Sequence, residues 1–247
     1  MNADYKPIGT VLEIWRYPVK GMAGEKLDSA KMGWNGLAGD RRYALHRVGS
    51  RSGLPFASPR DTPSLIRYRP VFRNPEDIDH SAIDVYTPSG TALDLYDSRV
   101  LAELETPEGG CLQVLTLWRG AYDAAPLSAI TTASITAVGA MIGKHLETAR
   151  FRPNFVIETI DTRQYPEDKW VGDLLVFGDN AEAGRMRVNR KDLRCVVVNL
   201  NPATGEKDCD VLMEVVKNRK NFLGVYGSAE RPGRVQVGDT VYLAKNR

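Results

Sequence analysis

Short runs of alternating apolar and polar residues recur along the whole chain, and each run ends at Gly, Pro or Asp. Val11–Tyr17 alternates until Pro18, and Arg42–Val48 ends at Gly49-Ser50. An alternation of period two, closed by turn residues, predicts a strand. The runs predicted to be strands are residues 11–17, 42–48, 65–72, 83–86, 114–118, 155–158, 174–177, 185–188, 195–200 and 241–243. Many short strands with regular turns are typical of a β-barrel or a sandwich.

Helical patterns are few. Residues 134–143 predict one helix, with Ser134 as its N-cap and Gly143 near its end, and residues 211–218 predict another. Leu101–Leu104 predicts a single turn. The fold class is therefore mainly β with a few helices (α+β). The small-residue segment 121–126 near the midpoint indicates a boundary between two domains, residues 6–120 and 121–247.

Composition and charge narrow the classes of function. The 247 residues include 43% hydrophobic and 26% charged residues, which is ordinary for a globular protein with a real core. A formal net charge of +2 argues against a general nucleic-acid coat, so no nucleic-acid partner is expected. A local basic pocket remains compatible with that value, because net charge hides how charges are distributed.

The termini, the apolar runs and the cysteines bear on location. Residues 1–6 contain no apolar segment of a signal peptide, and no apolar run approaches the roughly 18–20 residues needed to cross a bilayer. Three cysteines, Cys111, Cys195 and Cys209, are few and odd in number, which indicates a reducing compartment. We therefore expect a soluble cytoplasmic protein with no membrane partner.

Cys195 is the candidate for chemistry. A lone cysteine inside a β-branched run is most often a small buried hydrophobe. Arg194 precedes it, however, and Arg190 and Lys191 are close in sequence. Cations favour the thiolate, which is both a nucleophile and a soft metal ligand. The turn residues 201–205 indicate that the segment ends near the surface.

The segment 150–155 places two arginines two residues apart. If it is a strand, Arg150 and Arg152 share a face and can fork onto phosphate oxygens, while Asn154 offers a donor and an acceptor. The alternative is a solvated basic strand whose arginines pair with Glu147 or Asp161. The residues alone leave the two interpretations open.

Two further groups suit an anion. The hydroxyls of Thr131, Thr132 and Ser134 stand at the start of the predicted helix, where free N–H groups attract anions. From these residues alone, simple capping by Ser134 or Thr132 is the better explanation. Lys20 and Arg41 each lie in a turn beside a strand. Lone cations of this kind are usually solvated.

Taken together, the order and spacing of these segments resemble the MOSC family, named for the C-terminal domain of molybdenum cofactor sulfurase. The resemblance is greatest to the branch containing the mitochondrial amidoxime-reducing component and its bacterial relatives. The segments that carry it are Tyr17-Pro18-Val19-Lys20, Gly39-Asp40-Arg41, 56–65, Arg152-Pro153-Asn154, 170–178, 194–205 and 232–243. Gly21 departs from the hydroxyl residue that relatives often have after the lysine.

The resemblance implies a MOSC-type β-barrel joined to an N-terminal β-barrel-like domain, with a molybdenum cofactor (molybdopterin) between the two halves. It implies that Cys195 is the catalytic residue and the protein ligand of the metal. The pterin and its phosphate would be held by Lys20, Arg41, Thr131, Thr132, Ser134, Arg152 and Asn154, and Arg150 is added on physical grounds.

Two functions follow from the resemblance. One is a molybdenum-dependent oxidoreductase that reduces small N-hydroxylated or N-oxygenated substrates. The chain has no ferredoxin cysteine motif, so its electrons would come from a separate ferredoxin- or flavin-type protein. The alternative is a sulfur carrier or cofactor-binding module in which a cysteine desulfurase, through pyridoxal-phosphate-linked sulfur transfer, loads a persulfide on Cys195.

Two minor possibilities remain. A zinc site is disfavoured, because the cysteines and the three histidines lack ligand spacing. Cys209 lies near enough in sequence to pair with Cys195 in a regulatory disulfide, a pairing that the sequence leaves open.

Overall fold

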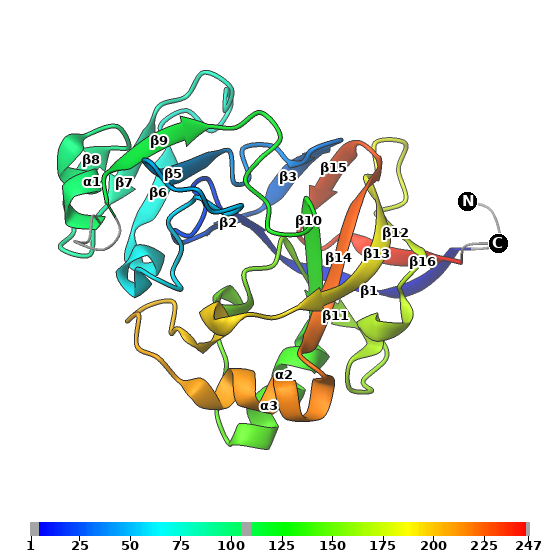
Figure 1. Ribbon diagram of the computed structural model, residues 1–247. Helices are drawn as coiled ribbons and strands as arrows, with labels where there is room; N and C mark the ends of the chain where they lie inside the picture. Colours follow the sequence, from blue (N-terminus) through cyan, green and yellow to red (C-terminus); the bar gives the residue numbers. More distant parts are fainter. Residues whose placement is uncertain (1–4, 105–109, 246–247) are drawn as a thin grey trace.

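Seven strands close into a β-barrel in the computed structural model, which describes residues 5–104 and 110–245 (Figure 1). Around the barrel, each strand pairs with the next, and the last pairs with the first. The strands, in spatial order, are β1 (Tyr5–Arg16), β11 (Phe155–Thr159), β10 (Leu127–Thr131), β14 (Phe222–Arg231), β13 (Arg185–Leu193), β12 (Leu174–Phe177) and β16 (Thr240–Ala244). β2 (Glu25–Leu27) pairs with the end of β1.

The inward face of the barrel is apolar. Val11 and Ile14 of β1 are buried against a core whose centre includes Phe155 and Phe177, with ring centroids 4.6 Å apart. β1 closes the barrel because it pairs with β11 on one side and with β16 on the other. Gly9 permits the approach to β11, since a Cβ there would lie 2.2 Å from the Glu158 carbonyl oxygen.

The remaining N-terminal residues form a smaller lobe beside the barrel. β5 (Tyr43–Arg47) pairs with β9 (Leu112–Thr116) in one sheet of this lobe. A second sheet and two helical segments surround a separate apolar core. They are β6 (Arg69–Phe72), β7 (Ile83–Tyr86), β8 (Ala92–Asp94), the 3-10 helix η1 (Pro63–Arg67) and α1 (Ser98–Leu104). A third sheet joins the two bodies and comprises β3 (Ser29–Gly33), β4 (Gly36–Leu37) and β15 (Gly233–Gln236).

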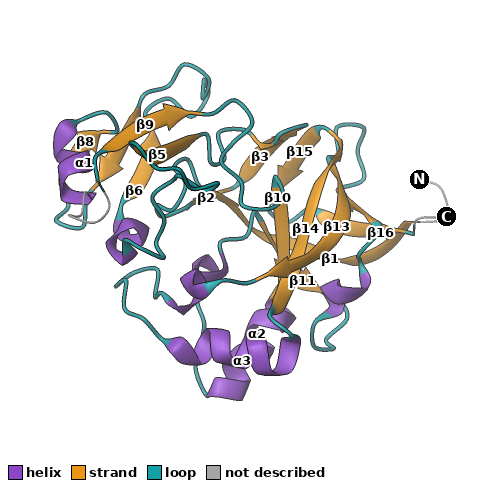
Figure 2. Ribbon diagram, viewed as in Figure 1, coloured by secondary structure: helices purple, strands orange, loops and turns teal. Residues whose placement is uncertain are grey.

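Two helices cover one end of the barrel and create a third apolar cluster (Figure 2). They are α2 (Thr132–Ile142) and α3 (Cys209–Arg219). α2 ends at Gly143, in the left-handed conformation, as predicted. Its N-cap is Thr131 rather than Ser134, because the Thr131 hydroxyl accepts the Ser134 N–H.

The predicted fold class is confirmed: strands predominate, with few helices and a closed barrel. Most predicted strands are present, with shifted ends. The strand predicted for residues 65–72 was wrong in its first half. There Pro63 begins the 3-10 helix η1, in which Leu65 and Ile66 are both buried. None of the described helices is long and apolar enough to cross a membrane.

The strand predicted at 195–200 was also wrong. Residues Val196–Asn199 form a 3-10 helix, η4, in which the Cys195 carbonyl accepts the Val198 N–H. Burial of Val197 and Val198, together with the Asn199 carboxamide that accepts the Leu212 N–H of α3, outweighs the β propensity of valine. The division at 121–126 stays a prediction, and residues 1–4 of the expected N-terminus lie outside the described part.

Candidate functional site

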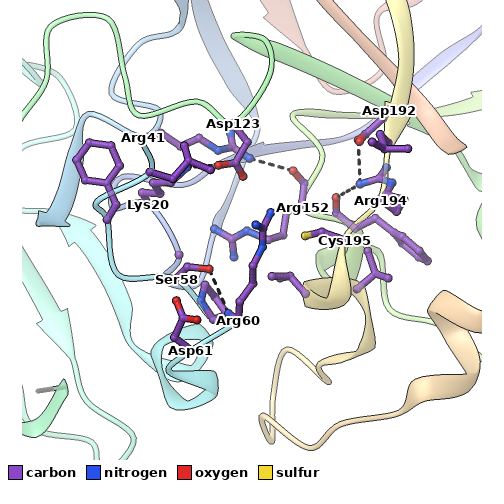
Figure 3. A pocket seen from close by; sticks show the side chains of 18 of the residues that line it. Lys20, Arg41, Ser58, Arg60, Asp61, Asp123, Arg152, Asp192, Arg194 and Cys195 are labelled. Carbon is purple, nitrogen blue, oxygen red and sulfur yellow. Dashed lines mark hydrogen bonds and ion pairs between the residues drawn. The ribbon is translucent and has the colours of Figure 1, made fainter. Parts of the chain in front are cut away.

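A cavity of about 400 Å³ lies where loops of the N-terminal lobe face the barrel (Figure 3). Its volume is in the range of sites that enclose a small molecule or cofactor. From the N-terminal lobe it is lined by Lys20, Gly21, Arg41, Arg47, Ser52, Leu54, Phe56, Ser58, Pro59, Arg60 and Asp61. From the rest of the chain it is lined by Asp123, Arg150–Arg152, Asp192–Cys195, Val197, Val198 and Tyr226. Cationic side chains outnumber carboxylates, so the cavity suits an anion.

Cys195 lies between the end of β13 and η4, and its side chain is partly exposed to the cavity. All three cysteines are free thiols in this structure, so Cys209 is not disulfide-bonded to Cys195. Arg60 extends toward Cys195 from the turn before η1 (Figure 3). Its pKa is raised, chiefly by its attraction to the Cys195 thiolate.

Arg152 is the cavity cation with the fewest partners. Among the described residues, no carboxylate or carbonyl accepts a hydrogen bond from its guanidinium, which packs 4.3 Å from the centroid of the Tyr17 ring. Burial lowers the pKa of Arg152 to about 10, and neighbouring Arg41 adds to the decrease. A desolvated guanidinium that keeps its charge at neutral pH is stabilised by an incoming anion.

The segment that carries both arginines is not a strand. Residues Thr148–Phe151 form a 3-10 helix, η2, and Arg152 follows it in the left-handed region with φ 51°. Arg150 and Arg152 therefore do not share a strand face. Arg150 donates to the Val198 carbonyl at 3.3 Å and to Glu147 at 3.2 Å, so the alternative pairing with Glu147 is present, while Asp161 pairs with Arg163.

Lys20 and Arg41 lie across the cavity from Cys195 (Figure 3). Lys20 donates to the Ala121 carbonyl at 2.8 Å and to Asp123 at 2.5 Å. Burial lowers the pKa of Lys20, and Asp123 opposes that change. Arg41 has φ 50° and donates to the Arg152 carbonyl at 3.1 Å. Two cavity arginines in the left-handed region cost roughly 1–2 kcal/mol each, which is typical of functional sites.

Arg194 holds the wall behind Cys195. Its guanidinium donates at 2.7 Å to both the Leu223 and the Phe151 carbonyl oxygens, and pairs with Asp192 at 2.9 Å. Both members of the pair are buried. The Arg194 guanidinium therefore binds protein groups and not a ligand. Its role is to fix the backbone from which the Cys195 side chain projects.

Four of the predicted cofactor residues do not line this cavity. Thr131 and Ser134 are fully buried, and Thr131 donates to the buried carboxylate of Glu167 at 2.8 Å. Thr132 is also absent from the described lining. Asn154 is 1% exposed and lies behind the wall, where it donates to Asp40 and accepts from Ser128. The side chains of Thr131, Ser134 and Asn154 therefore make hydrogen bonds within the protein instead of facing this cavity.

The structure brings together Lys20, Arg41, Arg150, Arg152 and Cys195 from the predicted set, and adds residues that the site prediction omitted. The additions are Arg47, Arg60, Asp123, Asp192 and Tyr226. Arg60 stood within the family-like segment 56–65, which was a usable signal. No local pattern marked the others, because their proximity depends on how distant segments of the chain pack against one another.

Asp192 makes the folding stability of the protein depend on pH. Burial raises its pKa to about 6, and the attraction of Arg194 opposes that rise. From the ordinary value near 4 to about 6, the folded protein keeps a proton that the unfolded chain has released, so stability falls as pH rises. We expect the free energy of unfolding of the apoprotein, relative to Asp192→Asn, to fall by up to ~3 kcal/mol across this window. Urea titrations of both proteins at several pH values test this, and parallel curves would contradict it.

Comparison with known proteins identifies the family of this chain. A family model described as the MOSC domain matches residues 117–242, about half of the chain, and one for the MOSC N-terminal beta barrel domain matches residues 8–101. The chain belongs to the MOSC family. Among the described residues of this MOSC protein, no group of three or more His, Cys, Asp and Glu side chains could hold a metal.

Relatives of this MOSC protein include amidoxime-reducing components. It is 30% identical to human mitochondrial amidoxime-reducing component 1 over 49% of its own length and 37% of that protein. It is 25% identical to component 2 of Macaca fascicularis over 95% of its length and 83% of that protein. The YuaD protein from Bacillus subtilis shares the fold, with a TM-score of 0.53, 10% identity, and coverage of 98% of this chain and 100% of that one.

Proposed function

We propose that the cavity binds a molybdenum cofactor and that the protein reduces N-hydroxylated or related N-oxygenated compounds, with Cys195 as the protein ligand of the metal. The observation that carries the proposal is the presence, in one cavity, of a partly exposed free thiol and of the Arg152 guanidinium, which stacks on Tyr17 but donates no hydrogen bond to any described residue. The names of the relatives, amidoxime-reducing components, support the type of reaction.

The cavity residues fit such a cofactor. A molybdopterin has an anionic phosphate and a dithiolene, so it needs cations at one end and a soft protein ligand at the other. Arg152, Arg41 and Lys20 would hold the phosphate end, and Arg60 would lie beside the thiolate. A metal held by the dithiolene and a single thiolate does not need a cluster of protein ligands. When bound, the cofactor supplies two-electron oxygen-atom-transfer chemistry.

The protein's own side chains would orient the metal ligand and the substrate, and would exclude water from the anion. Arg194 fixes the backbone of Cys195 through two carbonyl contacts, and burial around Arg152 keeps water from the anion. Leu54, Leu193 and Val197 give the cavity an apolar portion in which the body of a small substrate can lie. Electrons would come from a separate ferredoxin- or flavin-type protein.

The test uses protein expressed in a host that makes molybdenum cofactor. Metal content, fluorescence of oxidised pterin, and reduction of an amidoxime by a reduced viologen dye are measured on the same preparation. Bound molybdenum with turnover is the expected result. Bound molybdenum without turnover of an amidoxime or an N-hydroxylated base would contradict the reductase function.

The contact between Arg60 and Cys195 also suits a second function, a sulfur carrier, because a persulfide is an anion that a guanidinium stabilises. If the wild type contains no pterin, incubation with a cysteine desulfurase and cysteine should add one sulfur to Cys195. Mass spectrometry locates it, and sulfur on Cys111 or Cys209 instead would contradict this function.

A further inference from the structure

One buried carboxylate in the cavity wall has no role in the cofactor contacts described above. Asp192 is 2% exposed and lies three residues before Cys195, on β13. Its Oδ2 forms an ion pair with the Arg194 guanidinium at 2.9 Å. Its Oδ1 is buried, and no described residue lies in hydrogen-bonding geometry to that atom. A buried oxygen without a partner is costly, so its retention at a cavity requires an explanation.

A small polar side cavity adjoins this wall. It has a volume of about 30 Å³, and its lining shares Arg41, Asp123 and Tyr226 with the main cavity. Its other lining residues are Tyr122, Ala125, Ser128 and Asn154. The space and its polar lining are sufficient for an ordered water. Tyr226 of β14 lines both cavities, and its side chain interacts with that of Asp192.

The groups around Asp192 set its proton affinity. Arg194 faces it from its own segment, Tyr226 from β14, Arg41 from the turn before β5, and Asp123 from the loop before β10. Burial raises the pKa of Asp192 to about 6, and Arg194, Tyr226 and Arg41 partly oppose that rise. Burial, followed by Asp192, raises the pKa of Tyr226, which therefore keeps its hydroxyl proton near neutral pH. A carboxyl group with such a pKa both releases and regains a proton near neutral pH.

We propose that Asp192 is the proton donor of the cavity, and that it is reprotonated by water from the side cavity through the Tyr226 hydroxyl. This inference rests on the proposed reductase function. In the net reaction, the N–O bond breaks, two electrons from the external donor pass to nitrogen, and the oxygen leaves as water. Two protons are consumed: Asp192 Oδ1 gives one to the departing oxygen and, after reprotonation, one to nitrogen.

The test is the pH dependence of turnover in the cofactor-loaded protein. With reduced viologen and an amidoxime, Asp192→Asn should lower kcat by ~10² or more. It should also remove the limb of the wild-type pH profile that belongs to this carboxyl, with molybdenum content and KM unchanged. Asp192→Glu should restore part of the rate. Asp61→Asn is the matched control, because Asp61 lines the same cavity but is exposed and pairs with Arg47, and it should leave the shape of the profile unchanged.

Two further measurements do not depend on the Asn variant being active. Infrared titration of the apoprotein should reveal a buried carboxyl group that ionises near pH 6 and that is missing in Asp192→Asn. Tyr226→Phe should lower kcat several-fold and increase the solvent isotope effect, because reprotonation becomes slower.

The outcomes distinguish failure of the Asp192 role from failure of the reductase function. Wild-type turnover with an unchanged profile in Asp192→Asn would overturn the role of Asp192 and leave the reductase function standing. A wild type that binds molybdenum without turnover would overturn both. If Asp192→Asn does not fold, an infrared spectrum of the wild type without a carboxyl group titrating near pH 6 overturns the inference.

Discussion

Replacing Cys195 by serine is expected to reduce N-reductive turnover to the background of the assay without protein. A serine hydroxyl is a harder ligand than a thiolate and stays protonated at neutral pH, so it cannot replace the sulfur at a soft metal position. The pterin should remain bound, because the cations that would hold its phosphate are untouched. The measurement combines turnover per mole of pterin with metal analysis of the same sample.

The other two cysteines supply the controls. Cys111 and Cys209 are exposed, free, and outside the described lining of the cavity. Cys111→Ser and Cys209→Ser should keep full turnover and full metal content. Undiminished activity in Cys195→Ser would remove the metal–thiolate interpretation and leave Cys195 as a packing residue of the cavity wall.

Replacing Arg152 by alanine should weaken cofactor binding about 10- to 150-fold, which corresponds to the ~1.5–3 kcal/mol of a charge-assisted hydrogen bond. The stability of the apoprotein should change by less than ~1 kcal/mol, because the guanidinium has no hydrogen-bond partner among the described residues and its burial is itself costly. Pterin retained through gel filtration measures the first effect, and urea denaturation measures the second.

Arg150→Ala is the matched comparison, since Arg150 is a buried arginine two residues away that is bound to Val198 and Glu147. Its loss should destabilise the apoprotein by ~1–3 kcal/mol, because a buried carbonyl loses a charged donor. If Arg152→Ala instead unfolds the protein while the folded fraction keeps full cofactor, Arg152 is a structural residue.

Strand periodicity predicted the barrel class, because each strand buries one face and polar residues mark its turns. The same reasoning predicted a strand after Arg194, and that prediction was wrong. Three consecutive valines favour a strand locally, yet Val197 and Val198 are buried in a helical turn, and Val198 packs in the apolar cluster that includes residues of α3. Tertiary burial decides such segments, and a local pattern does not contain it.

For the site, the sequence predicted which cationic residues of separate turns line the cavity. It did not predict which polar side chains join them there. Lys20, Arg41, Arg152 and Cys195 meet in one cavity, whereas Thr131 and Ser134 turn toward Glu167. A hydroxyl at a helix start suits an anion or a buried carboxylate equally, so composition cannot choose between them. Asp192 was invisible for a related reason: a charged residue in a strand is usually solvated, and only the closed barrel buries it.

The closure of the barrel by β1 also governs the order of events during synthesis. β1 leaves the ribosome before every other strand of the barrel, yet its partner β16 leaves after all of them. Until β16 emerges, the β1 edge that it covers has unpaired backbone groups, and a cavity that depends on the barrel wall is incomplete. A large cofactor can therefore be captured only after translation of the whole barrel. A fragment beginning at residue 117 would lack β1, expose the edges of β11 and β16, and tend to aggregate.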